Sequence, residues 1–188
     1  MLQIFIGYLF LFFNFEINGL DLLPSFVGYI FIFVGLGKLK NESSYFSKSR
    51  PWAIVMTTFE VLSFAKLIIQ TELSVLLFTI LGYASAAVSI YIMFCIVKGI
   101  GDIEKTYCVA MEYEKIMLVW KIASALRIAI AMLTFLPTEL GSIISIGIAC
   151  IGFIVHIIFI VYINRVRKAY ENLPMNPWND GFPTDGNI

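Results

Sequence analysis

Glu60 and Arg127 are opposite charges that lie far inside long apolar stretches of the sequence. Glu60 lies eleven residues before Thr71, and Arg127 lies ten residues before Pro137. At a helical rise of about 1.5 Å per residue, both lie roughly 15 Å from the nearest turn and at matching depth. An unpaired charge near the middle of a bilayer costs roughly 3 kcal/mol, so such side chains face a bundle interior and pair. We therefore predict an ion pair between Glu60 and Arg127.

Hydroxylated side chains accompany both charges. Thr57 and Ser63 each lie three residues from Glu60, and Ser124 lies three residues before Arg127. Residues three apart share one face of a helix, so these side chains are expected to face the same interior as the charges. The predicted polar cavity is lined by Glu60, Arg127, Thr57, Ser63, Ser89 and Ser124.

His156 is the sole histidine and lies in the last apolar stretch, about 22 Å from the preceding turn by helical rise. Two roles are open to it: a hydrogen-bonded contact between helices, or a proton site. The ordinary pKa of histidine, about 6.5, suits the second role because it lies near physiological pH. His156 is therefore a candidate proton site.

Signatures of metal, cofactor and enzyme sites are missing from the sequence. Cys95, Cys108 and Cys150 are scattered, without the C-x-x-C spacing of a metal or redox pair. No H-E-x-x-H, G-x-S-x-G or P-loop motif occurs, and Gly-Ile-Gly at residues 99–101 is typical of a loop between helices. The sequence predicts no metal, no cofactor and no catalytic residue.

The candidate residues need a membrane-embedded scaffold, because 60% of the residues are hydrophobic and only 14% are charged. Soluble domains carry about 25% charged residues. A bilayer core about 30 Å thick is crossed by roughly 20 apolar residues in a helix. Six apolar stretches occur, at about residues 2–18, 23–39, 52–70, 73–98, 114–136 and 140–163. We predict an all-α, polytopic membrane bundle of six transmembrane helices.

The distribution of basic residues predicts the topology, because Lys and Arg are retained on the cytoplasmic side of membranes. Ten of the thirteen basic residues fall in alternate connections and in the C-terminal segment: Lys38, Lys40, Lys48, Arg50, Lys98, Lys105, Lys115, Arg165, Arg167 and Lys168. The other three connections contain acidic residues but no Lys or Arg. We expect three consecutive hairpins in one domain, residues 1–164, with both termini cytoplasmic. Residues 165–188, rich in proline and polar residues, are expected to form a mobile cytoplasmic tail.

The segment NFEINGLDLLPSFVGY, residues 14–29, separates the first two apolar stretches. We expect the first helix to run through Phe15, with the Asn-Gly pair at residues 18–19 supplying the turn. Pro24 suits the first turn of the second helix, where its missing N–H costs little. The two acidic residues of this segment then mark an outer turn.

The first fifty residues carry a recognisable pattern. The segment GLDLLPSFVGYIFIFVGL at residues 19–36 is followed by ESSYF at residues 42–46 and then by Arg50 and Pro51. This combination resembles a family of small multi-pass membrane proteins from Gram-positive, chiefly clostridial, bacteria. Ser25 stands where the family pattern has Asp, which argues against a catalytic or metal-binding carboxylate there. The resemblance implies the bacterial cytoplasmic membrane and no particular activity.

Three functions are open. The pattern favours a transport-type module, not an enzyme, that binds a small polar solute or ion at Glu60 and Arg127. The alternative is a non-transporting accessory, sensory or scaffolding subunit whose ion pair is structural, since a buried pair can often be replaced by packed hydrocarbon. The third is a membrane enzyme acting on lipids, although no nucleophile and base can be assigned.

The expected partners follow from the same composition. They are the lipid bilayer, a small polar solute, and a second membrane protein or a second copy of the chain. Nucleic acid is excluded as a partner, because the formal net charge is zero and the chain lacks a strongly basic face.

Overall fold

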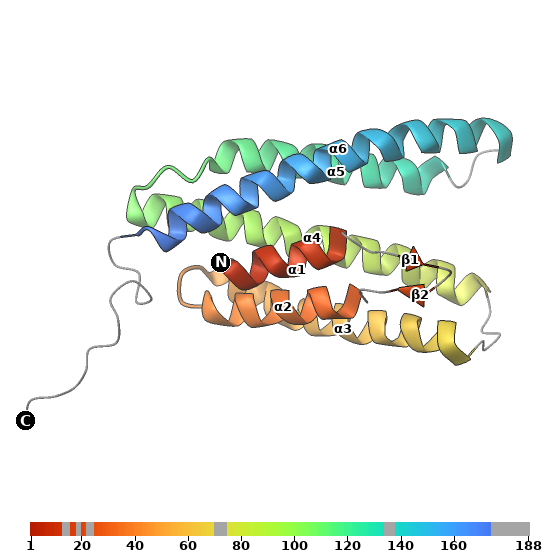
Figure 1. The fold of residues 1–188 in the computed structure, drawn as a ribbon, viewed down its shortest axis with the longest axis horizontal. Helices are drawn as coiled ribbons and strands as arrows, with labels where there is room; N and C mark the ends of the chain where they lie inside the picture. Colours follow the sequence, from red (N-terminus) through yellow and green to blue (C-terminus); the bar gives the residue numbers. More distant parts are fainter. Residues whose placement is uncertain (13–15, 18–19, 22–24, 70–74, 134–137, 174–188) are drawn as a thin grey trace, which may run out of the picture.

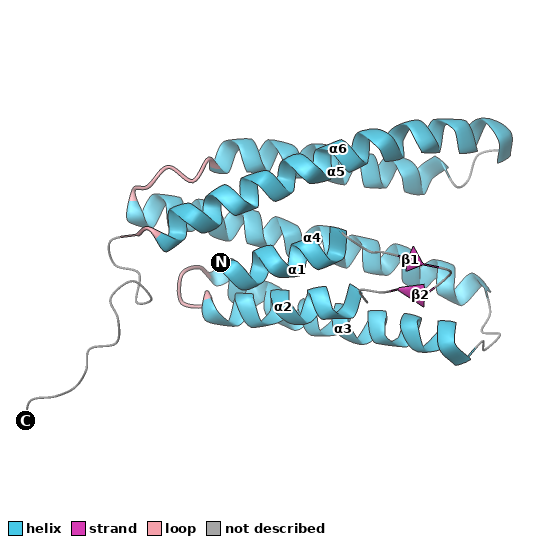
Figure 2. Ribbon diagram, viewed as in Figure 1, coloured by secondary structure: helices cyan, strands magenta, loops and turns pink. Residues whose placement is uncertain are grey.

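The computed structural model of this chain describes residues 1–12, 16–17, 20–21, 25–69, 75–133 and 138–173. The helices are α1 (Leu2–Phe12), α2 (Ser25–Lys38), α3 (Ser44–Ile69), α4 (Val75–Tyr107), α5 (Tyr113–Leu133) and α6 (Thr138–Glu171). Two short strands, β1 (Glu16–Ile17) and β2 (Leu20–Asp21), lie between α1 and α2 (Figure 1). Figure 2 shows that helix otherwise dominates the described residues. The predicted all-α class is confirmed.

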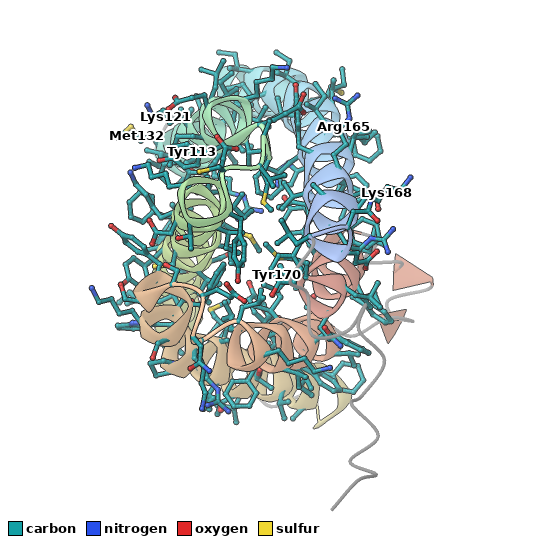
Figure 3. The ribbon with its side chains drawn as sticks, turned by 90° about the vertical axis from the view of Figure 1, so that its left-hand side faces the viewer. Tyr113, Lys121, Met132, Arg165, Lys168 and Tyr170 are labelled. Carbon is teal, nitrogen blue, oxygen red and sulfur yellow. The ribbon has the colours of Figure 1, made fainter. Side chains whose placement is uncertain are left out.

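The six helices form a closed ring in chain order. Successive helices run in opposite directions (Figure 1), and each one contacts the next along the chain. Helix α1 also contacts α6, which closes the ring. The end-on view in Figure 3 shows the helices arranged around a common centre, with side chains pointing into it. Short connections favour this order, because they join antiparallel neighbours.

Helices α1 and α2 cross at two glycines. A Cβ atom added at Gly7 would lie 2.6 Å from the carbonyl oxygen of Gly28, and one added at Gly28 would lie 2.8 Å from the carbonyl oxygen of Gly7. Small residues allow such close approach of two backbones, a common device in membrane bundles. The crossing fixes the directions of the residues that follow each glycine, Tyr8 and Tyr29.

One half of the ring has a tightly packed core, and we call this half the packed end. It comprises residues 1–7, 30–55, 94–122 and 157–173. In α4, the fully buried side chains at this end include Ile96, Ile100 and Ile103, spaced as on one helix face. The ring of Phe46 in α3 is also fully buried, and a Cβ atom added at Gly99 of α4 would lie 2.4 Å from it.

Hydrogen bonds between distant segments close the packed end. The hydroxyls of Tyr107 and Tyr170 each donate to the carboxylate of Glu42, at 3.0 Å in both cases. Glu42 lies in the α2–α3 turn, so this carboxylate joins that turn to the ends of α4 and α6. The Glu104 carboxylate accepts from the backbone N–H groups of Met111 and Tyr113, at 2.7 and 3.1 Å. The hydrogen bond from Tyr113 N–H satisfies a backbone donor at the start of α5 that has no partner within the helix.

The first helix is shorter than expected. It ends at Phe12 rather than continuing through Phe15, and Glu16 pairs with Asp21 in the antiparallel strands β1 and β2. The physical reason lies in the sequence between the strands, since Asn-Gly between apolar runs is the strongest short signal for a β-hairpin. Residues 18–19 and Pro24, expected as turn and helix start, lie outside the described residues.

Three other helices extend beyond their apolar stretches. Residues 99–101 lie inside α4, so the expectation of a loop there is wrong. The glycines are used for packing, since a Cβ atom at Gly101 would meet the ring of Tyr113 at 2.7 Å.

Helix α3 begins at Ser44, within the basic connection, and α6 continues to Glu171 rather than ending near residue 164. The first residues of the expected tail therefore belong to the bundle, while residues 174–188 lie outside the described part.

Among the residues that the structure describes, three helices are long and apolar enough to cross a membrane. These stretches are Thr79–Tyr107, Tyr113–Leu133 and Ile146–Glu171. Many large apolar side chains of α5 and α6 are exposed, including Leu118, Ile122, Ile128, Met132, Ile146, Ile154 and Ile157. Exposed apolar surface of this extent is unusual on soluble monomers and marks an interaction or membrane surface. Helices α1 and α2 are also apolar but contain only 11 and 14 residues.

Candidate functional site

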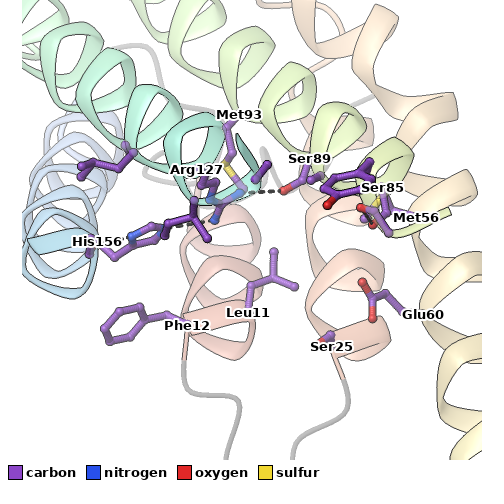
Figure 4. Close-up of a pocket in the computed structure, with 18 of the residues that line it drawn as sticks. Leu11, Phe12, Ser25, Met56, Glu60, Ser85, Ser89, Met93, Arg127 and His156 are labelled. Atoms are coloured by element: carbon purple, nitrogen blue, oxygen red, sulfur yellow. Dashed lines mark hydrogen bonds between the residues drawn. The ribbon is translucent and has the colours of Figure 1, made fainter. Parts of the chain in front are cut away.

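A cavity of about 780 Å³ lies in the other half of the ring, which we call the cavity half. This half comprises residues 8–12, 25–29, 56–69, 75–93, 123–133 and 138–156. All six helices contribute lining residues (Figure 4). The cavity is open rather than enclosed. The polar side chains in its wall are Tyr8, Ser25, Tyr29, Glu60, Thr79, Tyr83, Ser85, Ser89, Arg127 and His156. A volume of this size is typical of small-molecule sites, which measure about 300–1,000 Å³.

Arg127 reaches from α5 to both neighbouring helices (Figure 4). Its Nη1 donates a hydrogen bond to Oγ of Ser89 on α4 at 3.2 Å, and its Nη2 lies 2.9 Å from Nε2 of His156 on α6. A guanidinium group has donors and no acceptor, so Arg127 donates in both contacts. The side chain therefore ties α4, α5 and α6 together at the cavity wall.

The partners of His156 define its protonation state in this arrangement. Its Nδ1 lies 2.7 Å from the carbonyl oxygen of Gly152, one turn earlier in α6. The carbonyl can only accept and Arg127 can only donate, so Nδ1 carries the hydrogen and Nε2 offers its lone pair. His156 is thus a neutral imidazole, held as one tautomer by two hydrogen bonds. Its ring lies nearly parallel to those of Tyr8 and Phe12, at centroid distances of 6.4 and 6.2 Å.

Glu60 lines the same cavity from α3, on a different wall from Arg127 (Figure 4). The Arg127 guanidinium contacts Ser89 and His156, so the predicted Glu60–Arg127 pair is not observed. The ring order gives the reason. Helix α5 has α4 and α6 as its neighbours, and these supply the acceptors Ser89 and His156 to Arg127. Equal depth in a membrane does not place α3 beside α5.

The remaining predicted residues lie outside the main cavity wall. Thr57 donates a hydrogen bond to the carbonyl oxygen of Ala53 in its own helix, at 2.8 Å. Ser63 is half-buried in α3 and is not part of the cavity lining. Ser124 is buried and lines a small neighbouring cavity of about 20 Å³, to which Arg127 and His156 also contribute. Of the predicted set, the main cavity therefore brings together Glu60, Ser89, Arg127 and His156.

Tyr8 and Tyr29 line the cavity from α1 and α2 and were not predicted as site residues. Both are almost fully buried, and each follows one of the crossing glycines. The sequence contains a signal for them: Gly-Tyr-Leu-Phe at residues 7–10 and Gly-Tyr-Ile-Phe at residues 28–31. The phenylalanines of the two motifs also stack, with ring centroids 5.7 Å apart. A short repeat in two antiparallel helices thus marks a symmetric contact that brings two tyrosines to the cavity wall.

No protein family, curated protein or solved structure matches this chain. Within the described ranges, no group of three His, Cys, Asp or Glu side chains is placed to hold a metal ion. Function is therefore inferred from the cavity itself.

Proposed function

We propose that the chain is a transport-type membrane module whose central cavity binds a small polar solute or ion. The observation that carries this proposal is an open cavity of about 780 Å³, walled by all six helices and holding Glu60, Arg127 and His156. Ionisable side chains within a membrane bundle are costly and characteristically line substrate or ion pathways. A site between helices that alternate in direction also suits a solute that must reach the middle of a bilayer.

The proposal includes six helices embedded in a bacterial cytoplasmic membrane as three hairpins, with both termini cytoplasmic. The ten basic residues of the alternate connections support this orientation, because all of them belong to the packed end. Lys and Arg are retained on the cytoplasmic side, so the packed end faces the cytoplasm and the cavity half lies toward the outside.

Helix α1 of the first hairpin is too short to cross this membrane by itself. At about 1.5 Å per residue, the 11 residues of α1 span roughly 16 Å, about half of a hydrocarbon core. In this arrangement the short strands β1 and β2, which follow α1, lie at membrane depth. Non-helical backbone is tolerated at membrane depth only where protein covers it or where it lines a water-filled cavity. An aqueous cavity beside α1 therefore fits the short first hairpin.

Ligand-induced thermal stabilisation of the purified protein tests the proposal. A panel of amino acids, organic acids, nucleosides and inorganic ions is added to the wild type, Arg127→Met, Glu60→Gln and Lys121→Met. At least one solute is expected to raise the melting temperature of the wild type and of Lys121→Met, in which an exposed charge of α5 is removed. The shift should be lost in Arg127→Met and reduced in Glu60→Gln. Equal shifts in all four proteins would reject this site.

A second function, an accessory or sensory subunit with architectural charges, is favoured by one observation. Arg127 already has acceptors on both neighbouring helices, as expected of a residue that locks helix positions. This alternative predicts that Arg127→Met combined with His156→Phe keeps both fold and cellular role, because apolar packing replaces the polar contact. The transport-type proposal predicts a folded protein without that role.

A further inference from the structure

We infer that the cavity binds the carboxylate of a small monoanionic solute at Arg127 and takes up one proton on His156 in the same event. The inference rests on the proposed function, and it assigns a substrate class and a coupled ion to that site. The Arg127–His156 contact, at 2.9 Å between Nη2 and Nε2, is the observation from which it starts.

The contact can exist in only one protonation state of His156. With Nδ1–H donated to Gly152, the remaining ring nitrogen must stay unprotonated to accept from Arg127. A proton on Nε2 would place two donors and two positive charges against each other. Protonation of His156 therefore breaks its contact with Arg127, and the contact opposes protonation.

A carboxylate bound between Arg127 and His156 instead favours protonation of His156. Each of its oxygens accepts hydrogen bonds, so one can receive Nη2–H of Arg127 and the other Nε2–H of a protonated His156. The proton comes from water and ends on Nε2, while the Nδ1–H bond to Gly152 is kept. Carboxylate binding and proton uptake thus favour one another, and linkage requires the effect to be reciprocal.

The charges around His156 also indicate that one proton is taken up with each carboxylate. Helix α1 presents the neutral Tyr8 and Phe12 to its ring, and α5 presents the cation Arg127. Across the cavity, α3 supplies Glu60 and α2 supplies Tyr29. A carboxylate that entered alone would add one negative charge to a membrane-embedded cavity. A carboxylate with one proton leaves the total charge of the cavity unchanged, which avoids that cost.

The rest of the cavity wall indicates what the carboxylate is attached to. Apolar and aromatic side chains surround the polar groups, among them Leu11, Phe12, Met56, Ile130 and Phe153. Sites of this composition bury the apolar body of a ligand while a few polar groups fix its orientation. The inferred substrate class is an aliphatic or aromatic monocarboxylate rather than a small inorganic anion.

Histidine-selective ¹⁵N NMR tests the inference directly, because the chain has a single histidine and gives one pair of ring signals. The purified protein in lipid nanodiscs is titrated with benzoate, and with benzamide as the uncharged analogue of equal shape. Without ligand, the ¹⁵N shifts are expected to identify the Nδ1–H tautomer. Benzoate at constant pH should convert the signals to those of imidazolium, whereas benzamide should leave them unchanged.

Binding measurements give the second readout. The affinity for benzoate is expected to fall with rising pH by up to about tenfold per pH unit, the limit for one coupled proton. His156→Gln should remove this pH dependence, and Arg127→Met should remove benzoate binding. Lys121→Met, which changes an exposed charge on α5, is the matched control and should behave as the wild type.

The outcomes separate this inference from the proposed function. An Nε2–H tautomer in the free protein, or benzoate binding without ionisation of His156, overturns the inference. In the second case a solute site at Arg127 still stands, so the transport-type proposal survives. Failure of benzoate to bind overturns the carboxylate assignment, and failure of the entire solute panel removes the proposed function as well.

Discussion

The packed end and the cavity half are built from the same helices but use small residues in opposite ways. At the packed end, Gly99 and Gly101 make room for the rings of Phe46 and Tyr113. In the cavity half, a Cβ atom added at Gly82 would meet no atom within 4 Å. Along α4, missing side-chain volume is therefore filled by a neighbour at the packed end and left as space at Gly82.

The polar groups of the two halves differ in the same way. At the packed end, Glu42 and Glu104 each accept two hydrogen bonds from donors in separate segments of the chain. These donors are tyrosine hydroxyls and backbone N–H groups. In the cavity half, the Arg127–His156 contact depends on the protonation of one ring nitrogen. The comparison therefore sets contacts between carboxylates and fixed donors at the packed end against a contact in the cavity half that depends on protonation.

Phe46→Ala is expected to have the largest effect on stability. The ring is fully buried at the packed end, and loss of a buried phenylalanine side chain costs about 3–5 kcal/mol of unfolding free energy. The matched variant is Phe153→Ala, which removes an exposed ring from the cavity wall and should cost much less. Denaturant titration in mixed micelles measures both, and equal losses would contradict the division into two halves.

Gly99→Ala and Gly82→Ala form the next comparison. The added methyl at Gly99 overlaps the Phe46 ring and should lower the free energy of unfolding by about 1–3 kcal/mol. The same change at Gly82 meets open space and should be neutral or stabilise by up to about 1 kcal/mol, because alanine favours helix. Thermal unfolding of both variants checks the sign, and a loss at both glycines would argue against an open cavity.

Glu42→Gln should destabilise the packed end by about 1.5 kcal/mol, the low end for hydrogen bonds to a charged group, because Glu42 is only half-buried. A double-mutant cycle with Tyr170→Phe isolates the contribution of the 3.0 Å hydrogen bond. Glu114→Gln, at an exposed position, is the control. Additive effects of Glu42→Gln and Tyr170→Phe would show that the contact contributes nothing.

Glu112→Gln should have the smallest effect, and one that depends on pH. The hydrogen bond from Lys115, with a further contact from Arg165, holds the pKa of Glu112 below its usual value of 4.5. A lowered pKa stabilises the folded state above about pH 4.5, and this contribution disappears as the pH falls through the folded-state pKa. The wild type should therefore melt slightly above Glu112→Gln at pH 7, and at the same temperature in strong acid.

The sequence predicted the parts of this molecule that depend on local pattern. Each of the six apolar stretches contains a helix, because long apolar runs favour helix over strand. The partner of Arg127 was predicted wrongly, because it depends on which helices are adjacent in the ring. The glycines at residues 99–101 were misread for the same reason, since only the packed structure shows the rings that occupy their space.

The candidate site could be predicted only in part. Charge and apolar context were sufficient to single out Glu60, Arg127 and His156, which line one cavity. Tyr8 and Tyr29 were missed because tyrosine in an apolar helix is ambiguous until the crossing of α1 and α2 is known. The repeated Gly-Tyr-Leu/Ile-Phe motif was the available signal, and its meaning depends on both copies meeting at their glycines.

The unequal lengths of the helices have a consequence for the lipid around the ring. Helix α1 contains 11 residues and α4 contains 33, or roughly 16 and 50 Å of helical rise. In a bilayer around such a ring, lipid beside α4 would meet helix across the whole hydrocarbon core, whereas lipid beside the first hairpin would meet helix over only part of it. Local thinning beside the first hairpin would reduce the length of non-helical backbone at membrane depth. Hydrophobic mismatch costs fractions of a kcal/mol per Å, so lipids with short acyl chains should gather beside α1 and α2.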